Sequence, residues 1–184
     1  MKFFSHLLVF FIFVFLFQGS NSSNLISQSC KEASKKDPNL KFDFCVTSLE
    51  DGSSKLQPPP TNLEGLTVLS IQLIKSNGTN MVSIISKFLK DKSFDQYAKA
   101  CLHDCFDLYS DVLSDLDDAV DAFKSKDFDT AATRLSASMD TSLTCEDQFK
   151  DKKGGKSPLT KENQFYFQLN AISLAFIQMI RQDY

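Results

Sequence analysis

The sequence has no tryptophan and only two histidines, six glycines and five prolines among 184 residues. It has no Gly-x-Ser-x-Gly elbow, no glycine-rich phosphate loop and no ligand spacing typical of a metal site. A histidine-assisted nucleophile would have to use His103, the one histidine outside the first 23 residues. Cys101 and Cys105 lie near His103, but on a helix its side chain points away from theirs. We therefore expect a protein that is not an enzyme and that holds no cofactor and no metal.

The sequence also lacks the two-residue alternation of β-strands, so we predict no sheet. Apolar residues recur instead every three or four positions over 62–90, 94–123, 128–149 and from Thr160 onward. Asn77, Gly78 and Thr79 interrupt the first segment, which we nevertheless expect to form one helix. The fold class predicted is all-α, an up-down-up-down four-helix bundle with an N-terminal α-hairpin extension.

The two middle helices form a hairpin around the short polar turn Lys124–Asp127. The first arm is expected to bury Cys101, Cys105, Leu108, Val112, Leu116, Val120 and Phe123. The second arm is expected to bury Phe128, Ala131, Ala132, Leu135, Met139, Leu143 and Phe149. Because the arms are antiparallel, Cys145 lies level with Cys101 and Cys105. Spacing alone lets either of them pair with Cys145, since residues four apart share a helix face.

Shorter segments flank these helices. Residues 24–50 carry Cys30 and Cys45 around a polar bend at 35–41, and a bond between these cysteines would close a small hairpin. Residues 51–61 contain a glycine and three consecutive prolines and are expected to be a linker. After a loop at 151–158, Thr160 is the expected N-cap of the last helix. Its apolar stripe is Phe165, Leu169, Ile172, Phe176, Met179 and Ile180.

Residues 1–23 have the pattern of a secretory signal peptide. Lys2 is followed by an unbroken apolar run from Leu7 to Phe17, which is shorter than the roughly 20 residues of a membrane span. A short membrane anchor is the alternative. We expect cleavage near Ser22 or Ser23, which leaves residues 24–184 as one secreted domain with no membrane attachment.

Charge and cysteine content limit the partners of that domain. Lys2 is the one residue with a formal charge among 1–23, so 19 basic and 23 acidic residues remain, a formal net charge of −4. This acidity argues against nucleic acid as a partner. Secretion favours disulfides, and the five cysteines leave one thiol over. Loop closure gives about 3 kcal/mol for a Cys30–Cys45 bond and about 4 kcal/mol for a Cys105–Cys145 bond.

Two surface features are predicted on the helices. An acidic stripe runs along the first arm and consists of Asp104, Asp107, Asp111, Asp115 and Asp118. It is either a solvated face or a surface complementary to a basic partner. Asn77-Gly78-Thr79 is an N-glycosylation sequon and predicts an exposed, modified Asn77.

Several short motifs resemble those of the plant invertase and pectin methylesterase inhibitors. These motifs are Cys30 with Phe44-Cys45-Val46, Leu102-His103-Asp104-Cys105, Leu108-Tyr109-Ser110-Asp111, Lys126-Asp127-Phe128-Asp129, Leu135-Ser136-Ala137-Ser138, and Thr144-Cys145-Glu146-Asp147 with Phe149. The Lys-Ser-Lys-Asp turn and the Ser-Pro-x-Thr-Lys-Glu-Asn segment at 157–163 are similar to a subgroup of invertase inhibitors typified by a plane-tree pollen allergen.

The resemblance implies a four-helix bundle with an N-terminal hairpin. It also implies Cys30–Cys45 and Cys105–Cys145 bonds, and Cys101 is then the free thiol because it is outside the shared pattern. The expected function is that of an apoplastic inhibitor that binds a plant cell-wall enzyme and blocks its active-site cleft. We expect a monomer or a weak dimer.

The residues expected to bind the target enzyme distinguish two candidate targets. Some invertase inhibitors insert Pro-Lys-Phe from the turn between the hairpin arms, whereas Phe128, Asp129 and Thr130 stand there in this chain. Pectin methylesterase inhibitors share the threonine before the last cysteine, here Thr144, which lies at their enzyme-facing surface. We therefore favour pectin methylesterase over acid invertase, with Thr144, Asp107 and Asp111 meeting the enzyme. Phe128 and Asp129, at the turn between the hairpin arms, are the other two residues that we expect to contact the target enzyme.

Two other functional classes remain open on sequence alone. A secreted helical protein with an apolar interior could be a small-ligand carrier. The domain also resembles pro-segments fused to pectin methylesterases, which suggests a structural role.

Overall fold

The computed structural model describes residues 22–151 and 155–182, and these form helices joined by short connections. Residues 22–36 are helical, and the elements that follow are α2 (Phe42–Ser54), α3 (Leu63–Lys90), α4 (Gln96–Lys124), α5 (Phe128–Gln148), a 3₁₀ turn η1 (Phe149–Asp151) and α6 (Thr160–Gln182). No strand occurs in this described part. The signal-peptide prediction falls on residues 1–21, outside it, and on Ser22 and Ser23, which begin the first helix.

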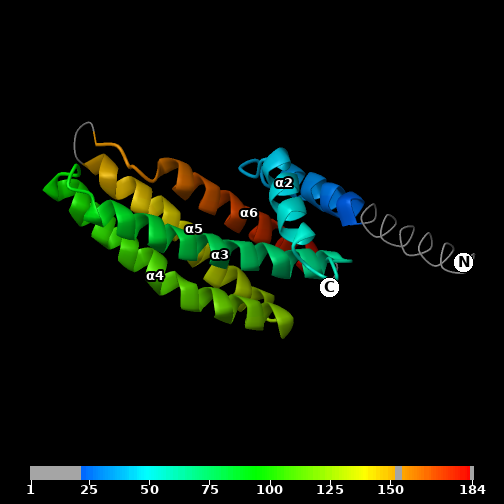
Figure 1. Ribbon diagram of the computed structural model, residues 1–184. Coiled ribbons are helices and arrows are strands. Elements are labelled where there is room, and N and C mark those ends of the chain that lie inside the picture. Colours follow the sequence, from blue (N-terminus) through cyan, green and yellow to red (C-terminus); the bar gives the residue numbers. More distant parts are fainter. Residues whose placement is uncertain (1–21, 152–154, 183–184) are drawn as a thin grey trace, which may run out of the picture.

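The four long helices form the expected bundle. Each of α3, α4, α5 and α6 packs against two of the others, in the ring α3–α4–α5–α6–α3. Figure 1 shows the four axes running alongside one another, with consecutive helices in opposite directions. The all-α, up-down-up-down prediction is therefore confirmed, together with the N-terminal hairpin made by residues 22–36 and α2.

Side-chain caps fix where three of these helices begin. Asn62 accepts a hydrogen bond from the backbone N–H of Gly65, Asp95 from that of Ala98, and Asp127 from that of Thr130. Each cap satisfies one of the backbone donors that the first helical turn leaves without a partner. The helix starts therefore follow directly from local sequence.

The last helix begins one residue away from the predicted arrangement. Thr160 is its first residue, and the N–H of Asn163 bonds to the carbonyl of Leu159. The Thr160 hydroxyl donates to Glu146 and to the carbonyl of Ser157 instead of accepting from the helix. Thr160 is therefore used to hold α6 against α5.

Helix α3 is continuous through Asn77, Gly78 and Thr79, as we expected. A Cβ atom at position 78 would lie 3.0 Å from a methyl carbon of Leu113 and 3.4 Å from the ring of Tyr166. Glycine has a low intrinsic helix propensity, but at position 78 its lack of a side chain allows α4 and α6 to approach α3 closely.

The predicted linker is shorter than expected, because α2 continues to Ser54. Gly52 and Ser53 are buried, and a Cβ on Gly52 would lie 3.1 Å from methyl carbons of Leu69 and Leu73 in α3. Packing on α3 stabilises a helical turn that composition alone disfavours. The linker proper is residues 55–61.

The N-terminal hairpin is attached to the bundle through α3 and α6. Gln168 of α6 accepts a hydrogen bond from the backbone N–H of Lys41 and donates one to the carbonyl of Asn39. Phe44 packs edge-on against Phe165, with ring centroids 4.9 Å apart. These contacts give a small hairpin, which has little core of its own, a fixed place on the bundle.

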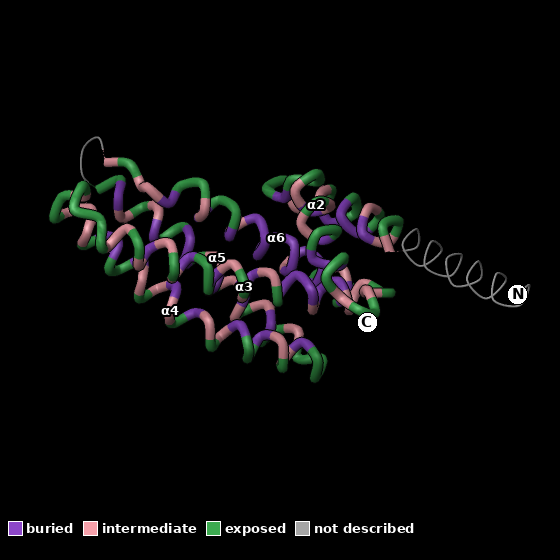
Figure 2. The backbone as a smooth tube through the Cα atoms, in the orientation of Figure 1, coloured by how far each residue is buried: buried purple, intermediate pink, exposed green. Residues whose placement is uncertain are grey.

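The buried face of α4, which packs against two other helices, differs from the predicted one. In α4, Leu102, Tyr109 and Ala119 are buried, whereas Leu108 and Val120 are only half-buried. Because α4 packs against both α3 and α5, its buried arc is wider than one apolar stripe. Figure 2 shows the buried residues on the facing sides of the four helices.

The predicted burial was wrong at Leu143 and Phe165, and it is only partial at four further residues of α5 and α6, namely Phe128, Ala132, Met139 and Met179. Leu143 is 45% exposed, Phe165 is 44% exposed and Met139 is half-buried. Phe165 instead covers the edge of Phe44. The core of α5 uses polar residues, among them Ser138, which is fully buried and bonded to the hydroxyl of Tyr166 at 2.7 Å.

Two disulfides join the cysteine pairs that the resemblance implies. Cys30 is bonded to Cys45 and Cys105 to Cys145, with Cα–Cα distances of 5.7 and 5.1 Å. Cys101 is a buried free thiol whose Sγ lies 3.7 Å from the carbonyl oxygen of Gln148. The second disulfide fixes the register of α4 and α5 at the end of the bundle far from their connecting turn.

Candidate functional site

The exposed end of the α4–α5 pair, near the Cys105–Cys145 disulfide, contains three of the predicted binding residues. Thr144 is exposed on α5, and Asp107 and Asp111 are exposed on α4. Because the helices are antiparallel with Cys105 opposite Cys145, these aspartates lie opposite the stretch of α5 that leads up to Thr144. We call Asp104, Asp107, Asp111 and Thr144 the disulfide-end surface.

This surface carries acidic groups without basic partners. Arg134 bonds to Asp115 at 2.7 Å and lies 3.6 Å from Asp118, so the charge of the far part of the acidic stripe is partly neutralised. Among the described residues, no ion pair involves Asp104, Asp107 or Asp111. The disulfide-end surface therefore presents net negative charge next to an exposed hydroxyl.

The turn between α4 and α5 is different, because its side chains contact one another and the bundle. Phe128 is half-buried against Phe123, with ring centroids 5.6 Å apart, and the Lys126 Nζ lies 5.9 Å from its ring centre. Lys126 also pairs with Glu64. We call residues 125–130 the turn surface.

Asp129 of the turn surface has a cationic partner. Its carboxylate lies 2.7 Å from Arg181 near the end of α6. Because Arg181 lies beside it, the turn surface presents less net negative charge at Asp129 than an unpaired carboxylate would. The pair is exposed, and such pairs contribute about 0–1 kcal/mol.

Beneath the disulfide-end surface lies a buried polar network that sequence reasoning missed. Asn163 accepts a hydrogen bond from the Tyr109 hydroxyl at 2.8 Å and donates to the Glu146 carboxylate at 3.0 Å. Its amide nitrogen also lies 3.6 Å from the Cys145 sulfur. The hydroxyl of Thr160 donates to the other oxygen of Glu146 at 2.7 Å. Two donors from α6, Thr160 and Asn163, thus hold the Glu146 carboxylate, and Tyr109 of α4 orients Asn163.

Two tyrosines of this region remain neutral over the physiological pH range. Burial, with added repulsion from Tyr166 and Glu146, raises the pKa of Tyr109 well above its ordinary value. Burial also raises the pKa of Tyr166 to about 12. Their rings meet edge to face, with centroids 5.0 Å apart. Both hydroxyls therefore serve as fixed hydrogen-bonding groups inside the bundle.

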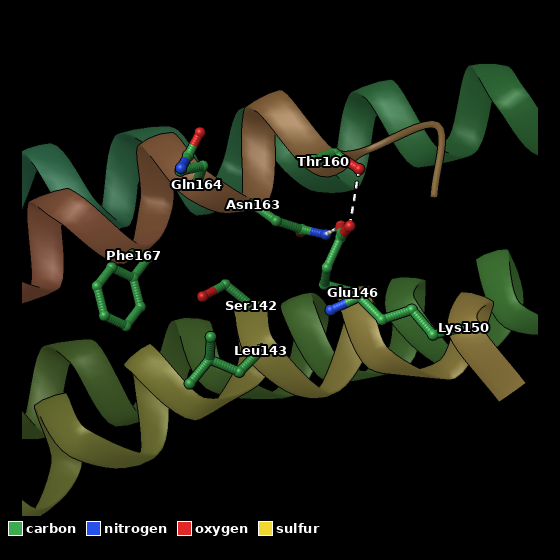
Figure 3. Close-up of a pocket in the computed structure, with 8 residues that line it drawn as sticks. All are labelled: Ser142, Leu143, Glu146, Lys150, Thr160, Asn163, Gln164 and Phe167. Atoms are coloured by element: carbon green, nitrogen blue, oxygen red, sulfur yellow. Dashed lines mark hydrogen bonds between the residues drawn. The ribbon is translucent and has the colours of Figure 1, made fainter. Parts of the chain in front are cut away.

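A groove between α5 and α6 adjoins the disulfide-end surface (Figure 3). Its volume is about 360 Å³, and it is lined by Ser142, Leu143, Glu146, Lys150, Thr160, Asn163, Gln164 and Phe167. Leu143 immediately precedes Thr144. Because consecutive helical residues point about 100° apart, Leu143 lines the groove while Thr144 lies outside it.

Other predicted positions lie away from this region. Asn77 lies inside α3 and is half-buried, and its Oδ1 has no hydrogen-bond partner in the described part of the chain. The sequon predicted an exposed side chain, so its burial differs from that expectation. His103 is exposed.

Two properties limit what the described residues can do. Over 22–151 and 155–182, no group of three or more His, Cys, Asp or Glu side chains could hold a metal ion. Within the same ranges, no helix is long and apolar enough to cross a membrane.

Comparisons with known proteins extend over the whole domain. The family model for "Plant invertase/pectin methylesterase inhibitor" matches residues 24–176. A "Putative invertase inhibitor" from Platanus acerifolia is 40% identical, over 96% of this chain and 97% of the relative. "Pectinesterase inhibitor 12" from Arabidopsis thaliana is 38% identical, over 98% of this chain and 100% of the relative.

Solved structures show the same fold. A crystal structure of a mutant form of a pectin methylesterase inhibitor from Arabidopsis superposes with a TM-score of 0.65 at 21% identity, over 80% of this chain and 96% of the other. A crystal structure of a pectin methylesterase inhibitor from Arabidopsis thaliana gives a TM-score of 0.57 at 22% identity, over 81% of this chain and 95% of the other. The matched family model and the near full-length relatives establish that this chain belongs to the plant invertase and pectin methylesterase inhibitor family.

Proposed function

We propose that this protein is a secreted inhibitor that binds a pectin methylesterase of the plant cell wall and covers its active-site cleft. The observation that carries the proposal is the position of Thr144. It is exposed directly before Cys145, whose bond to Cys105 fixes α5 against α4. A threonine at this point of the motif is what pectin methylesterase inhibitors of the family use at their enzyme-facing surface.

The disulfide-end surface suits binding to a basic partner. Asp104, Asp107 and Asp111 are exposed and lack basic partners in the described structure, so a partner can neutralise them without first breaking an internal pair. Charges of this kind mainly raise the association rate. Inhibition should weaken as salt is added, since exposed charges are screened over about 8 Å at physiological ionic strength.

The rigidity of this surface also supports an inhibitory role. The Cys105–Cys145 bond and the hydrogen bonds of Asn163 join α4, α5 and α6 beneath it. A surface that is already ordered loses little conformational entropy when it binds.

Inhibition of an acid invertase is the second candidate, favoured by the relatives named as invertase inhibitors. The turn surface does not support it. Phe128, Asp129 and Thr130 stand where some invertase inhibitors carry Pro-Lys-Phe, so the cationic side chain is absent. Insertion of Asp129 would also require it to leave Arg181.

The other functional classes find less support. A ligand carrier needs an internal space, whereas the centre of the bundle is occupied by large buried side chains that include Tyr109, Tyr166 and Phe176. A structural pro-segment would need no exposed binding surface of defined charge. Secretion to the apoplast, a monomer or weak dimer, and glycosylation at Asn77 remain parts of this proposal.

The proposal is tested by titrating the purified protein, without residues 1–23, into separate pectin methylesterase and acid invertase assays. We expect inhibition of a pectin methylesterase at nanomolar concentration and no comparable effect on the invertase. Nanomolar inhibition of the invertase, with no effect on any pectin methylesterase tested, would reverse the choice of target.

A further inference from the structure

The groove between α5 and α6 has the features of a receptor for one basic side chain. We propose that it receives an arginine or lysine from the target enzyme, with the charged head at Glu146 and the aliphatic stem against Leu143 and Phe167. This inference rests on the proposed function and adds a second contact region to the disulfide-end surface.

Glu146 is the charged group that such a head would meet. Its two oxygens accept hydrogen bonds from Thr160 at 2.7 Å and from Asn163 at 3.0 Å, and both donors are neutral. Lys150 lines the same groove and is attracted by the charge of Glu146, although its ion pair at 2.7 Å is with Asp147. Each carboxylate oxygen can accept more than one hydrogen bond. Glu146 therefore has lone pairs left to accept hydrogen bonds from a cation that enters the groove beside Lys150.

The position of Glu146 is fixed before any partner arrives. Asn163 is 3% exposed, and its other amide atom is held by the Tyr109 hydroxyl at 2.8 Å. Figure 3 shows the carboxylate directed toward Thr160 and Asn163 at one end of the groove. A half-buried, oriented carboxylate binds a cation more strongly than a mobile surface one, because less ordering is required.

The other end of the groove is apolar. Leu143 and Phe167 face each other there from α5 and α6 (Figure 3), and Leu143 is 45% exposed. Arginine and lysine bury their aliphatic stems along apolar surface while their heads reach a polar group. A volume of about 360 Å³ is at the lower end of the range for ligand sites and suits a single side chain.

The neighbouring surface explains why the occupant belongs to the enzyme. Leu143 in the groove and Thr144 on the disulfide-end surface are consecutive residues, so one partner can cover both. The aspartates of that surface also select a basic partner, and a basic loop on the enzyme would satisfy both regions.

The test measures the inhibition constant of four purified proteins against one pectin methylesterase. Glu146→Gln has nearly the same shape, but it replaces one carboxylate oxygen with an amide nitrogen and removes the charge. Leu143→Ser removes the apolar wall of the groove at an exposed position. Asp121→Asn is the matched control, because Asp121 is an exposed carboxylate near the turn surface, away from Thr144, and does not line the groove. Thermal melts establish that each variant is folded.

We expect Glu146→Gln to weaken inhibition by about 10- to 100-fold and Leu143→Ser by about 5- to 10-fold, in line with the loss of a partly buried charge pair and of an apolar contact. The Asp121→Asn control should stay within about 3-fold. If Glu146→Gln lowers the melting temperature, Leu143→Ser decides. Inhibition by both groove variants equal to that of the unaltered protein would overturn the groove proposal and leave the inhibitor proposal standing. Failure of the unaltered protein to inhibit would instead refute the proposed function, and the groove proposal with it.

Discussion

The two ends of the α4–α5 pair differ in how their side chains are used. They are separated by roughly 25 Å along α5, from Phe128 to Cys145. At the turn surface, polar and aromatic groups contact each other or the bundle, as Lys126 does with Glu64 and Asp129 with Arg181. At the disulfide-end surface the underlying Tyr109, Asn163 and Glu146 bond to one another, whereas Asp107 and Asp111 have no ion-pair partner in the described structure.

This difference shows how a small bundle divides stability from binding. A disulfide and buried hydrogen bonds stabilise the disulfide end from within, so its outer residues are not needed for folding. The turn has no such internal support and uses its surface residues to close the hairpin. Exposed charge alone does not identify a binding surface, but unpaired charge above a disulfide and a buried hydrogen-bond network is stronger evidence for one.

The largest expected effect comes from removing the internal support of the disulfide end. Cys105→Ser should lower the free energy of unfolding by about 4 kcal/mol, because the loop that the bond closes is released in the unfolded chain. Cys101→Ser should cost about 1 kcal/mol, since a serine hydroxyl can still donate to the carbonyl of Gln148. Denaturant unfolding of both variants measures the difference.

Equal losses from the two substitutions would show that the pairing at this end is wrong. Peptide mapping under non-reducing conditions gives a second reading. A peptide that links Cys101 to Cys145 would contradict the pairing directly.

A second effect concerns the buried tyrosines. The pKa of Tyr166 is raised to about 12 by burial, so between about pH 10 and pH 12 the unfolded chain loses this proton while the folded chain keeps it. Stability therefore falls as pH rises through this interval, at about 1.4 kcal/mol per pH unit for each such group. Tyr109 acts in the same direction.

Denaturant melts between pH 8 and pH 12 measure this slope. Tyr166→Phe should reduce it, although the variant starts from lower stability because Ser138 loses its partner. A slope unchanged in Tyr166→Phe would show that this tyrosine is not the group that titrates.

A smaller effect separates the two surfaces by function. Thr144→Arg should weaken inhibition of a pectin methylesterase by about 10-fold or more, because it places a bulky cation where a basic partner is expected. Thr133→Arg is the matched control, since Thr133 is an exposed threonine three helical turns nearer the turn surface. It should change inhibition by less than about 3-fold. If the control weakens inhibition as much as Thr144→Arg does, the enzyme contacts the turn surface.

The sequence predicted the helices and the bundle because these depend on local spacing and caps. It did not predict the extension of α2 through Gly52, because that turn is stabilised by Leu69 and Leu73 of another helix. It placed Leu143 in the core because Leu143 continues the helical spacing of apolar residues. That spacing does not show whether another helix covers the side chain.

The polar interior was missed for the same physical reason. Ser138 and Asn163 look like surface residues in sequence, and each becomes stable in the core only through a tyrosine from a distant segment. The candidate surface could be predicted as far as Thr144, Asp107 and Asp111, through the family resemblance and the acidic stripe. The groove beside it could not, since it exists only where α5 and α6 come together.

Carboxylate labelling of the free and enzyme-bound inhibitor tests the central claim most directly, namely that the disulfide end meets the enzyme. A carbodiimide and an amine label exposed Asp and Glu side chains, and mass spectrometry reads each position in the protein alone and in its complex with a pectin methylesterase. The account predicts that labelling of Asp107 and Asp111 falls in the complex while labelling of Asp129 does not change. Protection of Asp129, with Asp107 and Asp111 labelled as in the free protein, would contradict it.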